Sequence, residues 1–253
     1  MKSSNSATTG YDAWSATEYL RQFYTTATLA TDDVELLTRL AKWLRGTAPV
    51  QRALEVGCGP VIHHAALVTP YADEIHLADF LPDNLTQICL CRDDLPGQHD
   101  WTALLRHTLV LEGDGTDPGE RAAELRRKIT QLLHCDLTEP HPLGAPASYD
   151  LVTSFFCGEC VRSEVAEWEQ VVANLAGLVA PGGRLFIAAV RNASFYHVFD
   201  RTFPAACVNE THWSALLPKL GFDPAQTTVE AVSIPDWVDQ GFDSICVIAA
   251  AKS

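Results

Sequence analysis

Three acidic side chains stand where successive apolar segments of this chain end: Glu55, Asp79 and Asp136. If these segments are parallel strands, their carboxyl ends meet at one edge of a sheet, where such sheets bind ligands. Asp79 follows Gly57 by about 20 residues, the spacing at which an acid can accept hydrogen bonds from both ribose hydroxyls. Asp136 could take an adenine amino group. One acid alone would more often be a helix cap or a solvated loop residue, but the three together predict a nucleoside site.

A glycine turn comes directly after the first of these segments, in the run Leu54-Glu55-Val56-Gly57-Cys58-Gly59-Pro60. Glycine lets the backbone turn sharply and lets a ligand approach closely. The third glycine of a dinucleotide fingerprint is absent, and Glu55 is poorly suited to a diphosphate, so NAD and FAD are disfavoured. The amino acid and sulfonium of S-adenosylmethionine (SAM) suit this place better. A simple tight turn between strand and helix remains the alternative.

The cysteines do not form a metal-binding pattern. Cys89 and Cys91, and likewise Cys157 and Cys160, are close in sequence, but neither pair is followed by a matching pair at a zinc-finger distance. The sequence therefore predicts no metal site. Most of the eight cysteines fall in apolar segments, which favours reduced, packed thiols over disulfides.

Strands alternate with helices along the chain, which predicts an α/β fold: a Rossmann-like doubly wound sheet of about seven strands, mostly parallel, with helices on both faces. The connector 235–243 is too short for a crossover helix, so the last strand should be antiparallel to the strand before it. A turn at 181–183 supports this fold. The apolar segments read as strands are 53–56, 75–79, 131–134, 151–155, 185–190, 227–234 and 245–250.

Helical segments surround this core within one predicted domain, residues 1–253. Residues 1–48 should form an aromatic-rich amino-terminal helical lid and a covering helix over about 33–45, with Asp32 as its amino cap and Gly46 at its end. Residues 95–128 should form an insertion of two helices around Gly113-Asp114-Gly115. Trp101, Leu104, Leu105 and Leu109 should give this insertion an apolar face.

Composition limits the partners. The chain has 253 residues, 47% of them hydrophobic, and a formal net charge of -14. Such an acidic chain repels phosphate backbones, so a nucleic-acid partner is not expected, and the charge weakly favours cationic ligands. The polar segment 1–10 does not resemble an export signal, and no apolar run reaches the ~20 residues of a membrane helix. We expect a cytoplasmic protein that does not bind membranes.

Several stretches in order resemble the family of nicotinamide, phenylethanolamine and indolethylamine N-methyltransferases, which also contains thioether S-methyltransferases. The resemblance covers nearly the whole chain. The matching stretches are Glu18-Tyr19-Leu20 with Phe23-Tyr24, Glu55 to Pro60, Asp79 with Asp83-Asn84, His134 to Thr138 with Pro142-Leu143-Gly144, and Pro181-Gly182-Gly183 followed by Ser194-Phe195-Tyr196.

This resemblance implies a site for SAM. Tyr19 and Tyr24 would close over the cofactor, and aromatic rings there could exclude water and face a sulfonium. Gly57 and Gly59 would face the methionine part, next to Glu55. His63 replaces a tyrosine of the nicotinamide enzyme and is expected at the same place. The ribose and adenine contacts implied are Asp79, Phe80, Asn84, Asp136 and Leu137.

The acceptor site departs from the relatives. Glu159 matches a carboxylate of some amine-methylating members and is the predicted contact for an ammonium or proton acceptor, although it could instead cap a helix. Tyr196 is the second predicted catalytic residue, with Ser194 beside it in the acceptor wall. Asp239 and Asp243 could reach the same mouth. Acids that other members carry after the fifth strand are replaced here by Ala189 and Ala193.

The resemblance therefore implies a SAM-dependent methyltransferase, a monomer, that acts on a small molecule, with N-methylation of an amine or nitrogen heterocycle as the first expectation. S- or O-methylation is the nearest alternative. A lyase or an intramolecular cyclase of SAM on the same fold is a second class, with which the loss of two acceptor-site acids is compatible. A non-catalytic SAM-binding module is a third.

Overall fold

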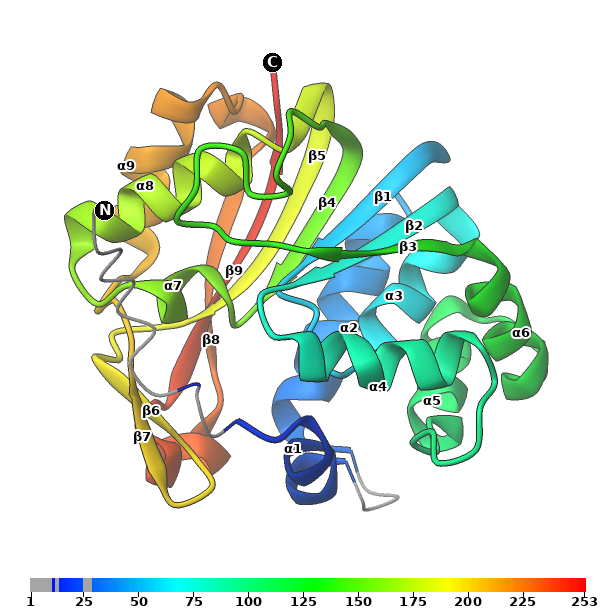
Figure 1. Ribbon diagram of the computed structural model, residues 1–253. Coiled ribbons are helices and arrows are strands. Elements are labelled where there is room, and N and C mark those ends of the chain that lie inside the picture. The colour runs from blue at the N-terminus through cyan, green and yellow to red at the C-terminus, as the bar shows by residue number, and fades with distance from the viewer. Residues whose placement is uncertain (1–10, 12–13, 25–28) are drawn as a thin grey trace, which may run out of the picture.

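Seven strands form one sheet in the order β3-β2-β1-β4-β5-β9-β8 in the computed structural model, which describes residue 11, residues 14–24 and residues 29–253 (Figure 1). β3, β2, β1, β4 and β5 are parallel to one another, and β9 runs antiparallel to both of its neighbours, β5 and β8. This confirms the predicted sheet. The strands are β1 (Val50–Val56), β2 (Ala72–Asp79), β3 (Ile129–His134), β4 (Tyr149–Phe155), β5 (Val179–Val190), β8 (Thr228–Ser233) and β9 (Ser244–Ala251).

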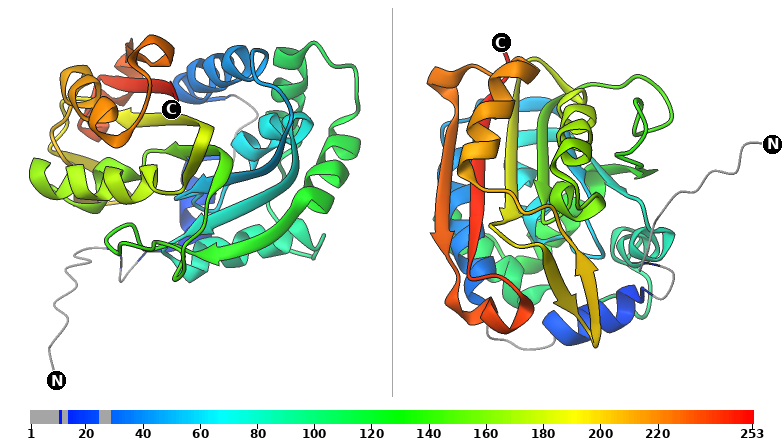
Figure 2. Two further views of the ribbon diagram at one scale, coloured as in Figure 1. Left: turned by 90° about the horizontal axis from the view of Figure 1, so that it is seen from above. Right: turned by 90° about the vertical axis from the view of Figure 1, so that its left-hand side faces the viewer.

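Helices cover both faces of the sheet (Figures 1 and 2). One apolar core joins the sheet to the helices from α2 to α6, and a second joins the opposite face to α8 and α9. The helices are α1 (Ala16–Phe23), α2 (Thr31–Leu44), α3 (His63–Val68), α4 (Pro82–Arg92), α5 (Thr102–Glu112), α6 (Pro118–Lys128), α7 (Gly158–Val161), α8 (Val165–Ala176) and α9 (Glu210–Leu216), with short 3-10 turns at η2 (Thr69–Tyr71), η3 (Leu217–Leu220), η4 (Pro224–Gln226) and η5 (Pro235–Gln240).

Sheet order decides where the acids meet. The chain starts at β1, moves outward through β2 to β3, and then returns to β4 on the other side of β1. The direction of winding therefore reverses between β1 and β4, and a crevice opens there at the carboxyl ends of the strands. Glu55 lies in β1, Asp79 ends β2, and Asp136 follows β3.

The predicted insertion consists of two helices, α5 and α6, and Gly113 ends α5 in the left-handed conformation. Trp101, Leu104, Leu105 and Leu109 are all buried, as the predicted apolar face required.

The predicted amino cap of the covering helix needs correction. Asp32 does not cap α2: the helix begins at Thr31, Ala30 is the residue before it, and no described side chain caps its amino end. Asp32 and Asp33 instead lie in the first turn, where the helix dipole favours acids. The structure also contains a separate hairpin that the sequence did not predict, β6 (Phe195–Val198) paired with β7 (Arg201–Pro204).

All eight cysteines are free thiols, as expected. Segment 1–10, which we expect not to be an export signal, lies outside the described residues. None of the described helices combines the length and the apolar character that crossing a membrane would require.

Candidate active site

A cleft of about 300 Å³ opens at the predicted edge of the sheet. Its floor comes from the ends of β1, β2 and β4. Its cover comes from residue 11, residues 14–24, the start of α2, β6 and η5. Eleven of the thirteen predicted site residues line it: Tyr19, Tyr24, Glu55, Gly57, Gly59, Asp79, Phe80, Asn84, Asp136, Leu137 and Tyr196.

Asp79 is the most extensively bonded of the cleft's acids. Its Oδ2 accepts a hydrogen bond from the Gly59 N–H at 2.8 Å, and its Oδ1 accepts from the Leu81 N–H at 2.8 Å and from Asn84 Nδ2 at 3.0 Å. Burial raises the pKa of Asp79, and these hydrogen bonds act in the opposite direction. A carboxylate offers about four acceptor positions. One therefore remains free on Oδ2, enough for one ribose hydroxyl unless the Gly59 bond is given up.

Gly57 and Gly59 form the turn between β1 and α3, and both have positive φ, +66° and +58°. At Gly57 an added Cβ would lie 2.2 Å from Cys157 Sγ, so no other residue fits against the end of β4. At Gly59 an added Cβ would meet nothing within 4 Å. Gly57 is therefore required by packing, while Gly59 keeps the cleft open beside Asp79.

Glu55 and His64 form a buried pair in the cleft wall. His64 Nδ1 lies 3.2 Å from Glu55 Oε1, and the His64 ring stacks on Phe155 with ring centroids 3.8 Å apart. Burial, with the nearby Asp79 charge, raises the pKa of Glu55 well above its usual range. Burial also lowers the pKa of His64 well below its usual range, and His63 beside it adds to the effect. A cation bound in the cleft would favour the ionised form of Glu55.

The lid is held to the cleft floor by hydrogen bonds. Trp14 Nε1 donates to Asn84 Oδ1 at 2.8 Å, and the Ala16 N–H donates to Asp83 Oδ2 at 2.7 Å. Because Asn84 also donates to Asp79, the lid is connected to the acid that ends β2. Trp14 packs against Tyr19 with ring centroids 5.0 Å apart, which extends the aromatic cover.

Tyr196 faces the cleft from β6, and its hydroxyl lies 2.7 Å from that of Tyr11. Burial raises the pKa of both hydroxyls far above the ordinary tyrosine value. Both are therefore neutral hydrogen-bonding groups at neutral pH, and neither is a base there.

Two predicted residues do not line the cleft. Glu159 is fully buried in α7, its Oε1 accepts a hydrogen bond from the Val190 N–H at 2.8 Å, and burial raises its pKa to about 7. Through this hydrogen bond the Glu159 side chain connects α7 to the end of β5, and it does not cap α7. His63 is also fully buried, and the next residue, His64, lines the cleft in its place. Ser194, Asp239 and Asp243 likewise lie outside the lining.

Some lining residues carry no strong signal in the sequence. Tyr11 and Trp14 belong to an aromatic-rich segment that the sequence did mark, but no spacing singled them out. Cys157 and Cys160 carry no metal-binding pattern, but their position just after a buried strand is itself a site signal. Phe156, Trp237 and Phe242 complete an apolar wall.

The charge of the cleft is negative. Among the described lining residues, five carboxyl groups stand against one guanidinium: Asp32, Asp33, Glu55, Asp79 and Asp136 against Arg162. Such a lining favours positively charged or amine ligands.

Together, a doubly wound sheet with an antiparallel last strand, a glycine turn, an acid ending β2 and an aromatic cover define a SAM-dependent methyltransferase. A model of the NNMT/PNMT/TEMT family matches residues 3–253, so the chain belongs to that family. It is therefore an enzyme that uses SAM.

Known proteins agree with this assignment. Indolethylamine N-methyltransferase of Mus musculus is 27% identical over 79% of this chain and 76% of its own length. Phenylethanolamine N-methyltransferase of Bos taurus is 29% identical over 56% of this chain and 52% of its own length. Nicotinamide N-methyltransferase of Sus scrofa is 27% identical over 67% of this chain and 65% of its own length. The aligned parts thus span half to three quarters of these relatives.

Solved structures support the fold. A complex described as DhpI-SAM-HEP superposes with a TM-score of 0.57 at 14% identity, over 93% of this chain and 91% of the other. N-methyltransferase NodS from Bradyrhizobium japonicum WM9, solved with S-adenosyl-L-homocysteine, superposes with a TM-score of 0.52 at 14% identity. The match covers 94% of this chain and 99% of the other.

Proposed function

We propose that this enzyme transfers the methyl group of SAM to the nitrogen of a small amine or nitrogen heterocycle. The observation that carries this proposal is the combination, in one cleft, of five carboxyl groups with a wall of aromatic rings. Carboxylates and ring faces both attract cations and amines. The names of the curated relatives, which methylate indolethylamine, phenylethanolamine and nicotinamide, support the same acceptor class.

We assign the two halves of the cleft from the sheet order. Asp79, Phe80, Asn84, Asp136 and Leu137 lie at the β2 and β3 side and would hold the ribose and adenine. The glycine turn at the end of β1 would face the methionine part. This leaves the β4 side, with the β6–β7 hairpin and η5, for the acceptor; Phe156, Cys160, Tyr196, Trp237 and Phe242 line that side.

Asp32 is the carboxylate that we place against the acceptor, instead of Glu159. It lines the cleft, and burial raises its pKa to about 6, while the nearby Trp237 indole lowers it. Among the described residues its Oδ1 is buried and makes no hydrogen bond of good geometry. The Thr31 hydroxyl next to it donates to Asp236 at the start of η5, which brings the beginning of α2 to the acceptor side. A buried carboxylate oxygen without a partner is a suitable contact for an N–H group.

When bound, SAM supplies an electrophilic methyl group on a positively charged sulfur. The chain's own residues must then align the acceptor nitrogen with that methyl and keep water out. The aromatic cover excludes water, and Tyr11 with Tyr196 offers neutral hydroxyls that can orient an acceptor. Such positioning can supply ~7 to 11 kcal/mol of the barrier without a dedicated base. A ring nitrogen attacks in its neutral form, whereas an alkylamine must first lose a proton.

The test is incubation of the enzyme with SAM, alone and with indolethylamine, phenylethanolamine, nicotinamide or dimethyl sulfide, followed by mass spectrometry. We expect S-adenosylhomocysteine and an N-methylated product only when a nitrogen acceptor is present. Methylthioadenosine formed from SAM alone would instead indicate a cyclase or lyase, and turnover confined to the sulfide would indicate S-methylation. Either result would overturn the proposal.

Asp32→Asn provides the residue-level arm of this test. We expect kcat/KM for a cationic amine to fall about 10-fold or more, because a charge-assisted hydrogen bond contributes ~1.5 to 3 kcal/mol. The Kd for SAM should change less than about twofold. Asp236→Asn, which removes a neighbouring negative charge but keeps an oxygen that can accept from the Thr31 hydroxyl, is the matched control.

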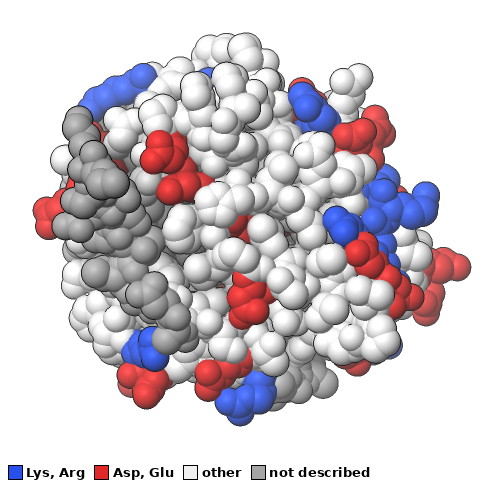
Figure 3. Space-filling model, in the orientation of Figure 1, with Lys and Arg blue, Asp and Glu red and all other residues white. Residues whose placement is uncertain are grey.

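We further propose that the enzyme acts as a monomer in the cytoplasm without a nucleic-acid partner. The acidic net charge of -14 supports the last point, as does the face in Figure 3, where most basic side chains have acidic ones beside them. Light scattering coupled to gel filtration would test the monomer, with a dimer mass as the contrary result.

A further inference from the structure

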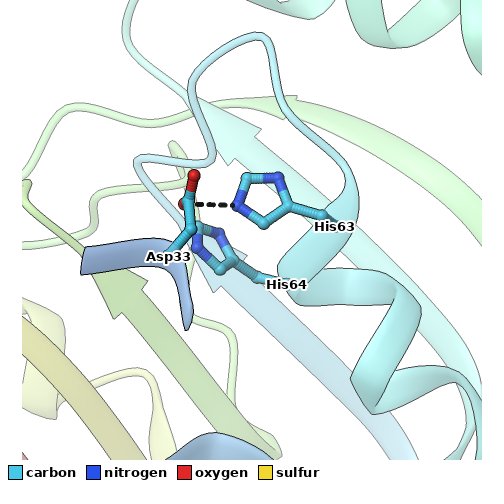
Figure 4. Close-up of side chains that lie close together, drawn as sticks. All are labelled: Asp33, His63 and His64. Carbon is cyan, nitrogen blue, oxygen red and sulfur yellow. Dashed lines mark ion pairs between the residues drawn. The ribbon is translucent and has the colours of Figure 1, made fainter. Parts of the chain in front are cut away.

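Asp33, His63 and His64 form a buried cluster where the start of α2 meets the first turn of α3 (Figure 4). His63 Nε2 lies 3.2 Å from Asp33 Oδ1, and the two imidazole rings lie with centroids 4.0 Å apart. One potential ligand atom from each of the three side chains lies within 4.8 Å of the other two.

This cluster contains polar atoms that no described protein group satisfies. His63 Nδ1 and His64 Nε2 have no hydrogen-bond partner among the described residues, and His63 Nε2 faces only the Asp33 carboxylate, without hydrogen-bond geometry. Both histidines are at least 95% buried. Leaving a buried donor or acceptor unpaired costs ~1 to 3 kcal/mol, so such atoms in a folded protein require an explanation.

We propose that Asp33, His63 and His64 bind one divalent metal ion of the zinc type. Two imidazole nitrogens and one carboxylate are a ligand set that zinc uses in proteins. Zinc-to-ligand bonds of ~2.0 to 2.1 Å place neighbouring tetrahedral ligands about 3.3 Å apart. The distance of 3.2 Å between Asp33 Oδ1 and His63 Nε2 is close to this ligand-to-ligand distance. The other two distances are at most 4.8 Å and would have to shorten to this value when the metal binds.

Glu55 supplies the outer contact that such a site needs. Its Oε1 lies 3.2 Å from His64 Nδ1, so the carboxylate can hold the proton on that nitrogen and leave Nε2 free for the metal. Histidine ligands of metals almost always donate their other N–H in this way. Asp33 and Glu55 pair only with histidines among the described ion pairs, so the cluster has carboxylates and no lysine or arginine to balance them.

The position of the cluster sets what the ion would do. It would fasten α2 to α3 and thereby fix the helix that follows the glycine turn. Because Asp33 and His64 line the cleft, three protein ligands would leave the fourth position open toward it, as in zinc sites that bind a substrate or water. The site stands apart from the methyl-transfer proposal, since zinc binding can be measured without SAM or an acceptor.

The experiment uses the full chain, stripped with a chelator and titrated with ZnCl₂ by calorimetry or against a chromophoric zinc indicator. We expect one equivalent to bind, and the affinity to fall more than about 100-fold in His63→Gln and in Asp33→Asn. Glu55→Gln should weaken it about 10- to 100-fold through the outer contact. His76→Gln, which removes a buried histidine bonded to Tyr149 elsewhere in the sheet, should bind zinc as the parent does.

Cobalt separates this site from the cleft thiols. Co²⁺ bound by the cluster should show tetrahedral absorption bands without a thiolate charge-transfer band. Circular dichroism of each variant confirms that it is folded. The proposal is wrong if the stripped parent binds no zinc, if folded His63→Gln binds it equally well, or if Co²⁺ shows thiolate ligation from Cys157 or Cys160.

Discussion

At the scale of single residues, Glu159 shows how burial can change the role of a group that the sequence singled out. Its carboxyl is fully buried and its pKa is raised from 4.5 to about 7, chiefly by burial. A carboxyl with a raised folded-state pKa stabilises the fold below its unfolded pKa, and this contribution is lost as pH rises through the folded pKa. The contribution of Glu159 to the free energy of unfolding should therefore fall as the pH rises from about 4.5 to about 7.

We predict that Glu159→Gln removes this dependence, because the amide oxygen can still accept from Val190 but cannot ionise. At pH 8 the variant should be more stable than the parent by roughly 3 kcal/mol, with little difference near pH 4.5. Urea unfolding at several pH values measures this. Glu139→Gln, at an exposed carboxylate, is the control and should keep the parent's pH dependence. Identical curves for the parent and Glu159→Gln would mean that the carboxyl is not neutral in the fold.

At the scale of elements, the glycine turn depends on its contact with the neighbouring strand. Gly57 has a φ of +66°, and its Cα faces Cys157 so closely that a methyl group has no room. We predict that Gly57→Ala destabilises the fold by at least roughly 2 kcal/mol, from left-handed strain and overpacking together, and impairs SAM binding.

Denaturant unfolding and SAM titration check this prediction. Gly158→Ala is a suitable control, because an added Cβ there meets nothing within 4 Å and its φ is not in the left-handed region. Adding Cys157→Gly to Gly57→Ala should recover part of the loss, since the crowding atoms are Cys157 Sγ and Cβ. If the double variant is no better than Gly57→Ala, the strain is in the turn alone.

At the scale of the whole molecule, bound SAM should stabilise the fold by mass action. The cleft that we propose for it is lined by the lid, β1, β2 and the loop after β3 together. SAM at about 100 times its Kd adds ~2.7 kcal/mol, which raises the Tm of a chain of this length by roughly 5 to 10 °C. We predict that Asp79→Asn weakens SAM binding about 10- to 100-fold and removes most of this shift.

Thermal unfolding with and without SAM measures the shift. Asp150→Asn changes an aspartate at the opposite end of the sheet, where it accepts from the Arg52 N–H, and should keep the full shift. A full shift in Asp79→Asn would show that this carboxylate does not hold the ribose.

The sequence by itself determined the alternation of strands and helices, the antiparallel last strand, the glycine turn and the acids at the strand ends. These features follow from local periodicity and from residues whose backbone needs are local, so they can be recognised along the chain. Strand order then brought Glu55, Asp79 and Asp136 to one edge, as the α/β pattern required.

Only the tertiary structure decided which side chains reach the cleft. Glu159 and His63 are turned into the core, while their neighbours Cys160 and His64 line the cleft, because a shift of one residue on a short helix changes the face by about 100°. The meeting of Asp33 with the two histidines, 30 residues away, depends on how α2 packs on α3. Side-chain direction and long-range packing are set by the whole core, and no spacing along the chain records them.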